Sequence, residues 1–190
     1  QEGVRLLDLS EADQKLIKYL AKHNHWTPFG HCSAQFHVKA PIFVARQLVK
    51  HQVGLAWNEV SRRYVDEEPE FWFPEVWRGR PVNAKQGSSG EVDRSSFTQF
   101  LSPEATLEYC LDLYETMLKA NVAPEQARMV LPQNTMTEWI WSGSLAAFAR
   151  VVKLRTDPHA QEETQEVARK INDLIPSDFE HSWKALLNDS

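Results

Sequence analysis

The most informative part of the chain is residues 41–64, which read PIFVARQLVKHQVGLAWNEVSRRY. The segment opens on an apolar run, Pro41 to Val44, and continues into a run rich in charged, amide and hydroxyl side chains. This composition does not suit a core helix, because a buried charge needs a partner. It suits a site that binds a phosphorylated ligand with many hydrogen-bonding groups. Four fixed positive charges stand there against one acid: Arg46, Lys50, Arg62 and Arg63 against Glu59.

Length and composition indicate an ordinary globular protein. The chain has 190 residues, 42% of them hydrophobic and 25% charged, which predicts one domain over residues 1–190 with a substantial core. The net charge of −5 argues against binding to a nucleic-acid polymer, since phosphate affinity comes mostly from basic surface. Local basic clusters in an acidic chain indicate a small anionic ligand instead.

Cysteine content and hydropathy indicate the cellular compartment in which the protein is expected. Cys32 and Cys110 are too few for a disulfide framework and are typical of small buried residues in a reducing compartment. No apolar run approaches the length of a transmembrane span, and no signal peptide is visible. We therefore expect a cytoplasmic protein without a membrane partner.

Local patterns in the first third predict a mixture of helix and strand. Ser10, followed three residues later by an acid, predicts the start of a helix that runs to about His23. Residues 27–30, TPFG, are expected to break this helix, and residues 32–38 alternate as in a strand. Pro41 predicts a second helix to about Val53, with loop or helix edge over residues 54–64. The expected buried face of the first helix consists of Leu16, Ile17, Leu20 and Ala21.

The C-terminal half is expected to be helical almost to its end. Helices are predicted after Ser102, after Pro124, over residues 145–155, over residues 157–174 and after Pro176. The helical stripe of the first of these is Leu107, Cys110, Leu111, Tyr114, Met117 and Leu118. The predicted fold class is therefore α+β, with a small sheet packed against several helices.

Residues 78–96 form a long polar stretch with three glycines. Loops of this length in compact domains are usually functional or disordered. Two interpretations stay open: a flexible loop that closes over the ligand as a lid, or plain disorder.

Two arginines lie in apolar helical contexts, Arg128 before Met129 and Arg155 after Leu154. An arginine beside a buried face needs a carboxylate or an anionic ligand. Taken alone, each is explained by a structural salt bridge or an exposed position. Together with the basic segment at residues 46–63, they suggest a cationic pocket assembled from distant parts of the chain.

The histidines do not predict a metal centre. His23, His25, His31 and Cys32 lie close in sequence, which raises the possibilities of a zinc site or an HNH nuclease. A zinc site requires a tighter ligand pattern, and a nuclease requires more than three matching residues. We expect no bound metal.

Several motifs resemble those of the flavin-dependent thymidylate synthases (ThyX). The family signature has Arg-His-Arg, a spacer, and then Asn-Glu-x-Ser-x-Arg-Tyr; here Lys50-His51-Gln52 is followed by Asn58 to Tyr64. The resemblance extends in the same order over about residues 14–170. Its other segments are His23 to His31, Phe36 to Gln47, Ala127 to Pro132, Leu154-Arg155 and His159-Ala160-Gln161.

The resemblance implies a homotetramer whose active sites lie between subunits. It implies reductive methylation of dUMP to dTMP, with methylenetetrahydrofolate as carbon donor, NADPH as reductant and FAD as hydride carrier. No protein nucleophile is required. The family's first strand and helix normally precede the segment that matches Leu16 to His25, so this chain is either trimmed or shorter than its relatives at the N-terminus.

The nucleotide-contacting positions of the family are matched throughout. The resemblance implies that Arg155 stabilises negative charge developing on the uracil ring, and that the backbone near Ser61 and Arg62 holds the phosphate. Ser61 is a second candidate for a catalytic role, although nothing identifies a base partner for it, so binding is favoured over attack. The implied substrate-binding set is Gln47, Glu59, Ser61, Arg62, Arg63, Arg128 and Arg155.

The flavin-contacting positions are matched only in part. Lys50 and Gln52 replace two arginines, Gly30 replaces a glutamate, and the spacer before Asn58 is one residue longer. Lysine keeps the charge without the planar fork, and glutamine loses the charge. In the late helix, Ser144, Ala146 and Arg150 replace Asn, Arg and Asn. The implied cofactor set is His25, Thr27, Lys50, His51, Gln52, Asn58, Glu59, Ser144 and Arg150.

The nucleotide-contacting positions match the family throughout, and the flavin-contacting positions match it only in part. This difference leaves alternatives to a working thymidylate synthase. One is a related enzyme that modifies another pyrimidine deoxynucleotide on the same fold, such as a hydroxymethylase. The other is a non-catalytic nucleotide-binding homologue. Flavin absorbance in the purified protein separates the enzymes from the latter, and product analysis separates the two enzymes.

Overall fold

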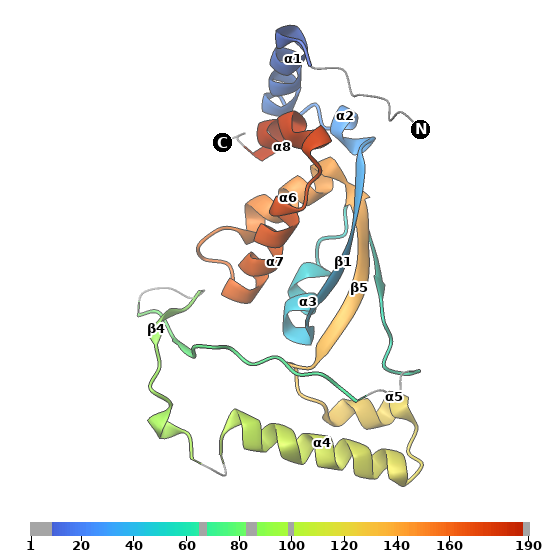
Figure 1. Cartoon of the computed structure of the whole chain (residues 1–190), viewed down its shortest axis with the longest axis vertical. Coiled ribbons are helices and arrows are strands. Elements are labelled where there is room, and N and C mark those ends of the chain that lie inside the picture. Colours follow the sequence, from blue (N-terminus) through green and yellow to red (C-terminus); the bar gives the residue numbers. More distant parts are fainter. Residues whose placement is uncertain (1–8, 65–67, 83–86, 99–100, 188–190) are drawn as a thin grey trace. The chain divides into compact units, whose positions relative to one another are not determined.

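The computed structural model describes residues 9–64, 68–82, 87–98 and 101–187. The fold is α+β, as predicted (Figure 1). The helices are α1 (Glu11–Lys22), α2 (Thr27–Gly30), α3 (Ile42–Leu48), α4 (Pro103–Lys119), α5 (Pro124–Ala127), α6 (Leu145–Arg155), α7 (Glu162–Asp173) and α8 (Glu180–Leu187). The strands are β1 (Ser33–Pro41), β2 (Leu55–Glu59), β3 (Arg78–Gly79), β4 (Ser89–Glu91) and β5 (Met136–Ser144). Short 3₁₀ turns are η1 (Arg94–Ser96), η2 (Arg128–Val130) and η3 (Ser177–Phe179).

The chain forms two compact units. Unit 1 consists of Gln1–Phe36, His51–Trp57 and Trp141–Ser190, and unit 2 of His37–Lys50 and Asn58–Ile140. Each strand of the three-stranded sheet contributes residues to both units. The single domain expected from the chain length stays a prediction.

Strands β1, β5 and β2 form a sheet in that order. Leu145 N donates to Cys32 O at one end of the β1–β5 pair and Ile42 N to Thr135 O at the other, so these strands run antiparallel. Both β2 and β5 contradict the sequence analysis, which expected a loop over residues 54–64 and helix through most of the C-terminal half.

The reason for the error at β5 lies in its alternating burial. Thr135, Trp139 and Trp141 are buried at 0%, 1% and 0% exposure, and Glu138 and Ile140 between them are more accessible. Aromatic and β-branched residues at every second position are typical of a half-buried strand. The alternation of buried and accessible side chains therefore indicates a strand here, although the neighbouring segments have a helical pattern.

Helix α6 is the centre of the core of unit 1. All five residues from Leu145 to Ala149 are buried. The ring of Phe148 packs edge-on against the rings of Phe36 and Trp141, with centroid distances of 4.9 and 5.4 Å respectively. Helices α1, α7 and α8 belong to the same unit, where α1 packs on α8 and α6 packs on α7 and α8. One apolar cluster joins Ala21, Phe29 and Ala146 to Ile17, Leu20, Ala185 and Leu186.

Several element boundaries differ from those expected. Helix α1 begins with the predicted capping box at Ser10, but Leu16 is 54% exposed because the helix presents Ile17, Leu20 and Ala21 to the apolar cluster. Residues 27–30, which were expected only to break the first helix, form a short separate helix, α2. Helix α3 ends at Leu48, and Gly54, with a φ of +75°, redirects the chain into β2. Helix α7 begins at Glu162 rather than at residue 157.

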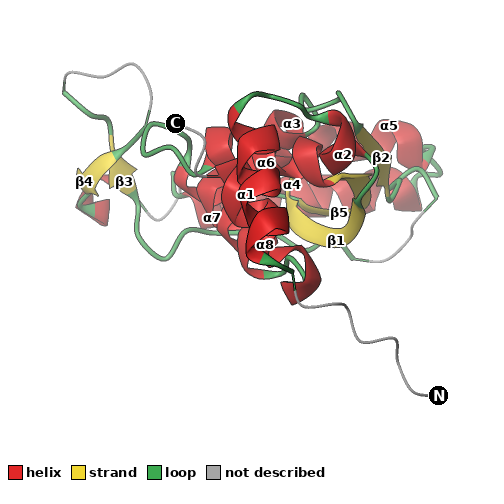
Figure 2. Cartoon of the chain, turned by 90° about the horizontal axis from the view of Figure 1, so that it is seen from above, coloured by secondary structure: helices red, strands yellow, loops and turns green. Residues whose placement is uncertain are grey.

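Unit 2 contains α4 with the predicted stripe, in which Tyr114 is 3% exposed. In the predicted lid segment, β3 and β4 pair as a short antiparallel ribbon, which Figure 2 shows in yellow beside the loops that lead to it. Residues 83–86 of that segment lie outside the described residues. Its behaviour as a lid stays a prediction. No helix in the described part of the chain is long and apolar enough to cross a membrane.

A substitution in β5 tests the close packing of β2 against it in unit 1. A Cβ added at Gly143 would lie 2.4 Å from Leu55 Cδ2 and 2.6 Å from Gly54 O. We expect Gly143→Ala to lower the free energy of unfolding by about 1–3 kcal/mol, the usual cost of overpacking. Urea unfolding followed by tryptophan fluorescence measures this change, and a variant as stable as the parent would contradict the packing.

Candidate active site

The residues predicted to form the site divide between the two units, and each group is described by itself. Unit 1 contains His25, Thr27, His51, Gln52, Ser144, Arg150 and Arg155. Unit 2 contains Gln47, Lys50, Asn58, Glu59, Ser61, Arg62, Arg63 and Arg128.

In unit 1, the segment His51–Gly54 is fixed to helix α6 by three hydrogen bonds. Ser144 N donates to Gly54 O at 3.1 Å, and Arg150 Nη2 donates to Val53 O at 2.7 Å. Arg155 Nε donates to His51 Nε2 at 2.8 Å. Two residues expected at the flavin, Ser144 and Arg150, therefore hold the backbone of the signature segment.

Ser144 and Gly54 fit this attachment closely. Ser144 is the N-cap of α6, and its Oγ accepts from Ala147 N at 3.2 Å. A Cβ at Gly54 would lie 3.2 Å from Ala147 Cβ and 3.3 Å from Ser144 Oγ, and the positive φ there also favours glycine. The end of the segment His51–Gly54 therefore packs directly against the start of α6.

The environment of His51 favours its neutral form. Burial, with the nearby Arg155 and Arg150 guanidinium groups, holds the pKa of the His51 imidazole below its ordinary value of 6.5. A neutral imidazole keeps one ring nitrogen as an acceptor, and here Nε2 fills that role toward Arg155.

A cavity of about 120 Å³ lies within unit 1. Two predicted flavin contacts, His25 and Arg150, line it together with Trp26 and Lys153. Trp26 and Lys153 were not among the predicted site residues, although Trp26 directly follows the candidate residue His25 in the sequence. The apolar lining consists of Leu20, Ala21, Phe29, Ala146, Ala149 and Leu186. An apolar floor with cations and an exposed aromatic ring suits a planar, negatively charged ligand.

Two of the departures from the family motif are explained by local packing. A Cβ at Gly30 would lie 3.0 Å from Trp26 Cζ3, so the tryptophan ring occupies the space beside this glycine. Ala146 is 5% exposed and belongs to the apolar cluster with Ala21 and Phe29. Position 146, where the resemblance implied an arginine, is therefore part of the core of unit 1.

In unit 2, Ser61–Arg63 form a turn directly after β2. Arg63 Nε donates to Ser61 Oγ at 2.8 Å, and Arg63 N donates to the same oxygen at 3.4 Å. The Arg63 guanidinium also lies 5.1 Å from the centre of the Tyr64 ring. Among the described residues, the Ser61 hydroxyl has no basic acceptor for its proton, which favours a binding role for this serine.

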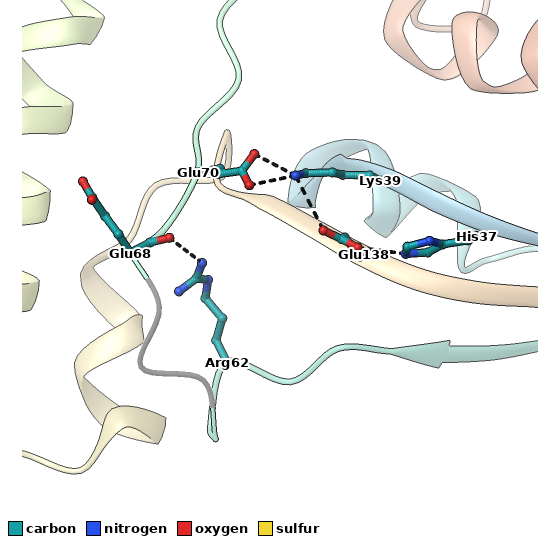
Figure 3. Close-up of polar contacts among 6 residues, drawn as sticks. All are labelled: His37, Lys39, Arg62, Glu68, Glu70 and Glu138. Atoms are coloured by element: carbon teal, nitrogen blue, oxygen red, sulfur yellow. Dashed lines mark hydrogen bonds and ion pairs between the residues drawn. The ribbon is translucent and has the colours of Figure 1, made fainter.

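The neighbouring polar groups hold this turn and the strand before it. Arg62 Nη2 donates to Glu68 O at 3.4 Å (Figure 3). Thr137 Oγ1 donates to Glu59 Oε1 at 2.8 Å, which fixes the carboxylate on the sheet. The guanidinium of Arg63 and the carboxylate of Glu59 thus have defined positions before any ligand binds.

A second polar cluster in unit 2 is satisfied internally. Lys39 Nζ lies 2.7 Å from Glu70 Oε2 and 3.6 Å from Glu138 Oε1, and His37 Nε2 lies 2.8 Å from Glu138 Oε2 (Figure 3). The hydrogen bond to Glu70 raises the pKa of the Lys39 ammonium. Because both carboxylates face cations already, this cluster is a surface ion-pair network and not an anion site.

Arg128 lies on the exposed side of η2, where its Nε donates to Glu125 O at 3.3 Å. Gln47 is half-buried on α3, and Lys50 is exposed just beyond that helix. His25 and Thr27 are exposed at the start of α2, and Gln52 and Asn58 are exposed at either end of the spacer. Within the described residues, no group of three His, Cys, Asp or Glu side chains could hold a metal ion.

Comparison with known proteins identifies the family. Residues 3–178 match the Thy1 family, described as thymidylate synthase complementing protein. This chain belongs to the Thy1 family. The flavin-dependent thymidylate synthase of Thermosipho africanus is 37% identical over 178 residues, which cover 93% of this chain and 78% of that protein. Its counterpart in Thermosipho melanesiensis is 39% identical over 178 residues, covering 93% and 77%.

A solved structure resembles this chain over most of its length. The UMP/dUMP methylase PolB from Streptomyces cacaoi, bound with 5-Br dUMP, superposes with a TM-score of 0.79 at 28% identity. The match covers 95% of this chain and 81% of PolB. The predictions of a ThyX-like fold and of a flavin-dependent thymidylate synthase are confirmed, so the chain is an enzyme of the Thy1 family that depends on a flavin.

Proposed function

We propose that the enzyme reductively methylates dUMP to dTMP, with FAD as its flavin, and with NADPH and methylenetetrahydrofolate as co-substrates. The observation that best supports binding of the nucleotide is the turn Ser61–Arg63, in which Arg63 Nε donates a hydrogen bond to Ser61 Oγ at 2.8 Å. A guanidinium fixed in advance loses little conformational entropy when it binds a phosphate. Glu59, held by Thr137, supplies an acceptor for an N–H or O–H group of the nucleotide.

The nucleotide site is completed by residues from other elements. Arg128, exposed on η2, is proposed to bind the phosphate, and Gln47 a polar group of the base or sugar. Arg155 is proposed to lie at the uracil ring and to stabilise its developing negative charge. We also propose a homotetramer with shared active sites, as the resemblance to the flavin-dependent thymidylate synthases implies.

The residues of unit 1 fit a flavin in part. Arg150 and Lys153 give the cavity a cationic side, His25 adds a polar ring, and Trp26 gives it an aromatic surface. When bound, the flavin carries hydride between NADPH and the nucleotide. The chain's own residues bind and orient the reactants, since no protein nucleophile is required. The half-buried thiols of Cys32 and Cys110 fit the proposed cytoplasmic location.

The substitution Gln52→Arg, which restores the arginine that the family resemblance implies at this position, tests the proposed flavin site. Gln52 is exposed and follows His51 directly in the segment fixed to α6. If this position faces the flavin, Gln52→Arg adds a cation and a planar fork, and we expect FAD to bind about tenfold more tightly, equal to roughly 1.4 kcal/mol. Isothermal titration with FAD measures the affinity, and Gln52→Lys separates the charge from the fork. Equal affinity in both variants and the parent would remove position 52 from the flavin site.

A second candidate substrate follows from the similarity to PolB, whose structures hold 5-Br dUMP and 5-Br UMP. We propose UMP as the alternative nucleotide on the same fold. Titration of the protein with dUMP and UMP decides between them. Tighter binding of dUMP supports the thymidylate synthase, equal or tighter binding of UMP supports a methylase with the wider range of PolB, and binding of neither contradicts both.

A further inference from the structure

The bond between Arg155 and His51 joins residues that lie 104 positions apart in the sequence. Arg155 is the last residue of α6, and His51 belongs to the segment that α6 holds. Both side chains are half-buried. At 2.8 Å from Nε to Nε2, the contact is a normal hydrogen bond in which the guanidinium donates.

This contact requires one protonation state and one tautomer of His51. Arginine is always charged and has no acceptor, so the imidazole must supply the lone pair. His51 must therefore be neutral, with its remaining proton on Nδ1. Nε2 is then committed to Arg155.

The position of His51 is itself fixed from α6. Val53 O is held by Arg150 Nη2 at 2.7 Å, and Gly54 O is held by Ser144 N at 3.1 Å. The backbone that follows His51 is thereby attached to α6, the helix that carries Arg155, and to its N-cap residue Ser144. A side chain with several rotatable bonds, such as arginine, gains a defined direction when its Nε is bound in this way.

We infer that neutral His51 is a positioning residue, which orients the Arg155 guanidinium by accepting its Nε–H and leaves the terminal nitrogens of that group free to face the substrate. The inference deepens the proposed function and rests on it for the catalytic meaning of Arg155. The bond itself is a property of unit 1 alone. It gives His51 a task different from the flavin contact that the family motif implies.

The charges that face His51 determine how the bond responds to pH. Arg155 and Arg150, both on α6, together with burial, hold the pKa of His51 below 6.5. At neutral pH the ring is therefore neutral and the bond is formed. As the pH falls through the lowered pKa, the imidazolium loses its acceptor and repels Arg155. Because the folded state takes up this proton less readily than the unfolded chain, stability also falls below pH 6.5.

Nuclear magnetic resonance of the protein without ligands tests the bond independently of activity. The Arg155 Nε–H signal, assigned by its loss in Arg155→Lys, is expected to be protected from exchange at pH 8 and to lose that protection with a midpoint below pH 6.5. In His51→Gln, whose amide oxygen can accept in place of Nε2, the signal is expected to stay protected at every pH. In His51→Ala it is expected to be unprotected. A signal that behaves identically in the parent and in His51→Ala would overturn the inference.

Kinetics then test the consequence for catalysis. At pH 8 and saturating dUMP, we expect His51→Ala to lower kcat about 10- to 100-fold, the effect of misplacing a catalytic group. His51→Gln is expected to stay within about threefold of the parent and to lose the acidic limb of the kcat–pH profile. His159→Gln, at an exposed histidine, is the matched control and should leave both unchanged.

The two experiments fail separately. A protected signal without any turnover of dUMP would preserve the bond and contradict the proposed function. Turnover in which His51→Gln is as slow as His51→Ala, or keeps the acidic limb, would overturn the positioning role.

Discussion

Arg155→Ala is expected to lower kcat for thymidylate formation by about 100- to 1000-fold, the range found when one preorganised charge-stabilising donor is removed from an active site. The guanidinium is held at Nε by His51 at 2.8 Å, so its terminal nitrogens are directed before the substrate arrives. Stopped-flow or steady-state turnover at saturating dUMP measures the loss.

Two controls separate the catalytic role of Arg155 from a structural one. Arg155→Lys keeps the charge but not the fork, so it is expected to recover only a small part of the activity. Arg169→Ala removes an exposed arginine of α7 that pairs with Glu162 and should leave kcat unchanged. If Arg155→Ala turned over at the parental rate, Arg155 would have no part in the chemistry.

Arg128→Ala is expected to weaken dUMP binding by about 1.5–3 kcal/mol, the usual value of a hydrogen bond to a charged group. The side chain is exposed on η2, and among the described residues its one hydrogen bond runs from Nε to Glu125 O at 3.3 Å. Its terminal nitrogens are therefore available to a phosphate. Isothermal titration with dUMP gives the affinity directly.

The adjacent residue provides the matched control for Arg128. Met129 is 77% exposed, and Met129→Ala should leave the affinity for dUMP unchanged. A phosphate contact also predicts that Arg128→Ala loses little affinity for deoxyuridine, which has no phosphate. Unchanged affinity of Arg128→Ala for dUMP would place this arginine outside the site and support its interpretation as a surface residue.

Elements determined by local chemistry could be predicted from the sequence. The capping box at Ser10 fixed the start of α1, and the apolar run over residues 145–155 predicted α6 with its bounds. In α4, the helical stripe predicted which face is buried, with Tyr114 as its most buried member. In each case the signal lies within a short run of consecutive residues.

Elements determined by distant partners were missed. β2 is short and partly exposed, and it becomes a strand through its pairing with β5. The alternation of Trp139 and Trp141 predicts a strand when taken alone, but the segments on either side of it carry the helical period, which favours helix throughout. Strand pairing across about 80 positions leaves no mark on local periodicity.

The candidate site shows the same division. Ser61 and Arg63, which the resemblance places together at the nucleotide, are hydrogen-bonded to each other in one turn, and their role in binding stays a prediction. The contact of Arg155 with His51, and that of Arg150 with Val53, could not be predicted, since each joins segments about 100 positions apart. At Ala146 the resemblance implied the loss of a flavin-contacting arginine, and the structure shows a core position in one cluster with Phe29.

The most direct test of the central claim is anaerobic turnover of the purified protein with FAD, NADPH, methylenetetrahydrofolate and dUMP, with the nucleotide products identified by mass spectrometry. We expect dTMP, formed only when all four components are present. A hydroxymethylated nucleotide, or unchanged dUMP that nevertheless binds to the protein, would contradict the proposed reaction.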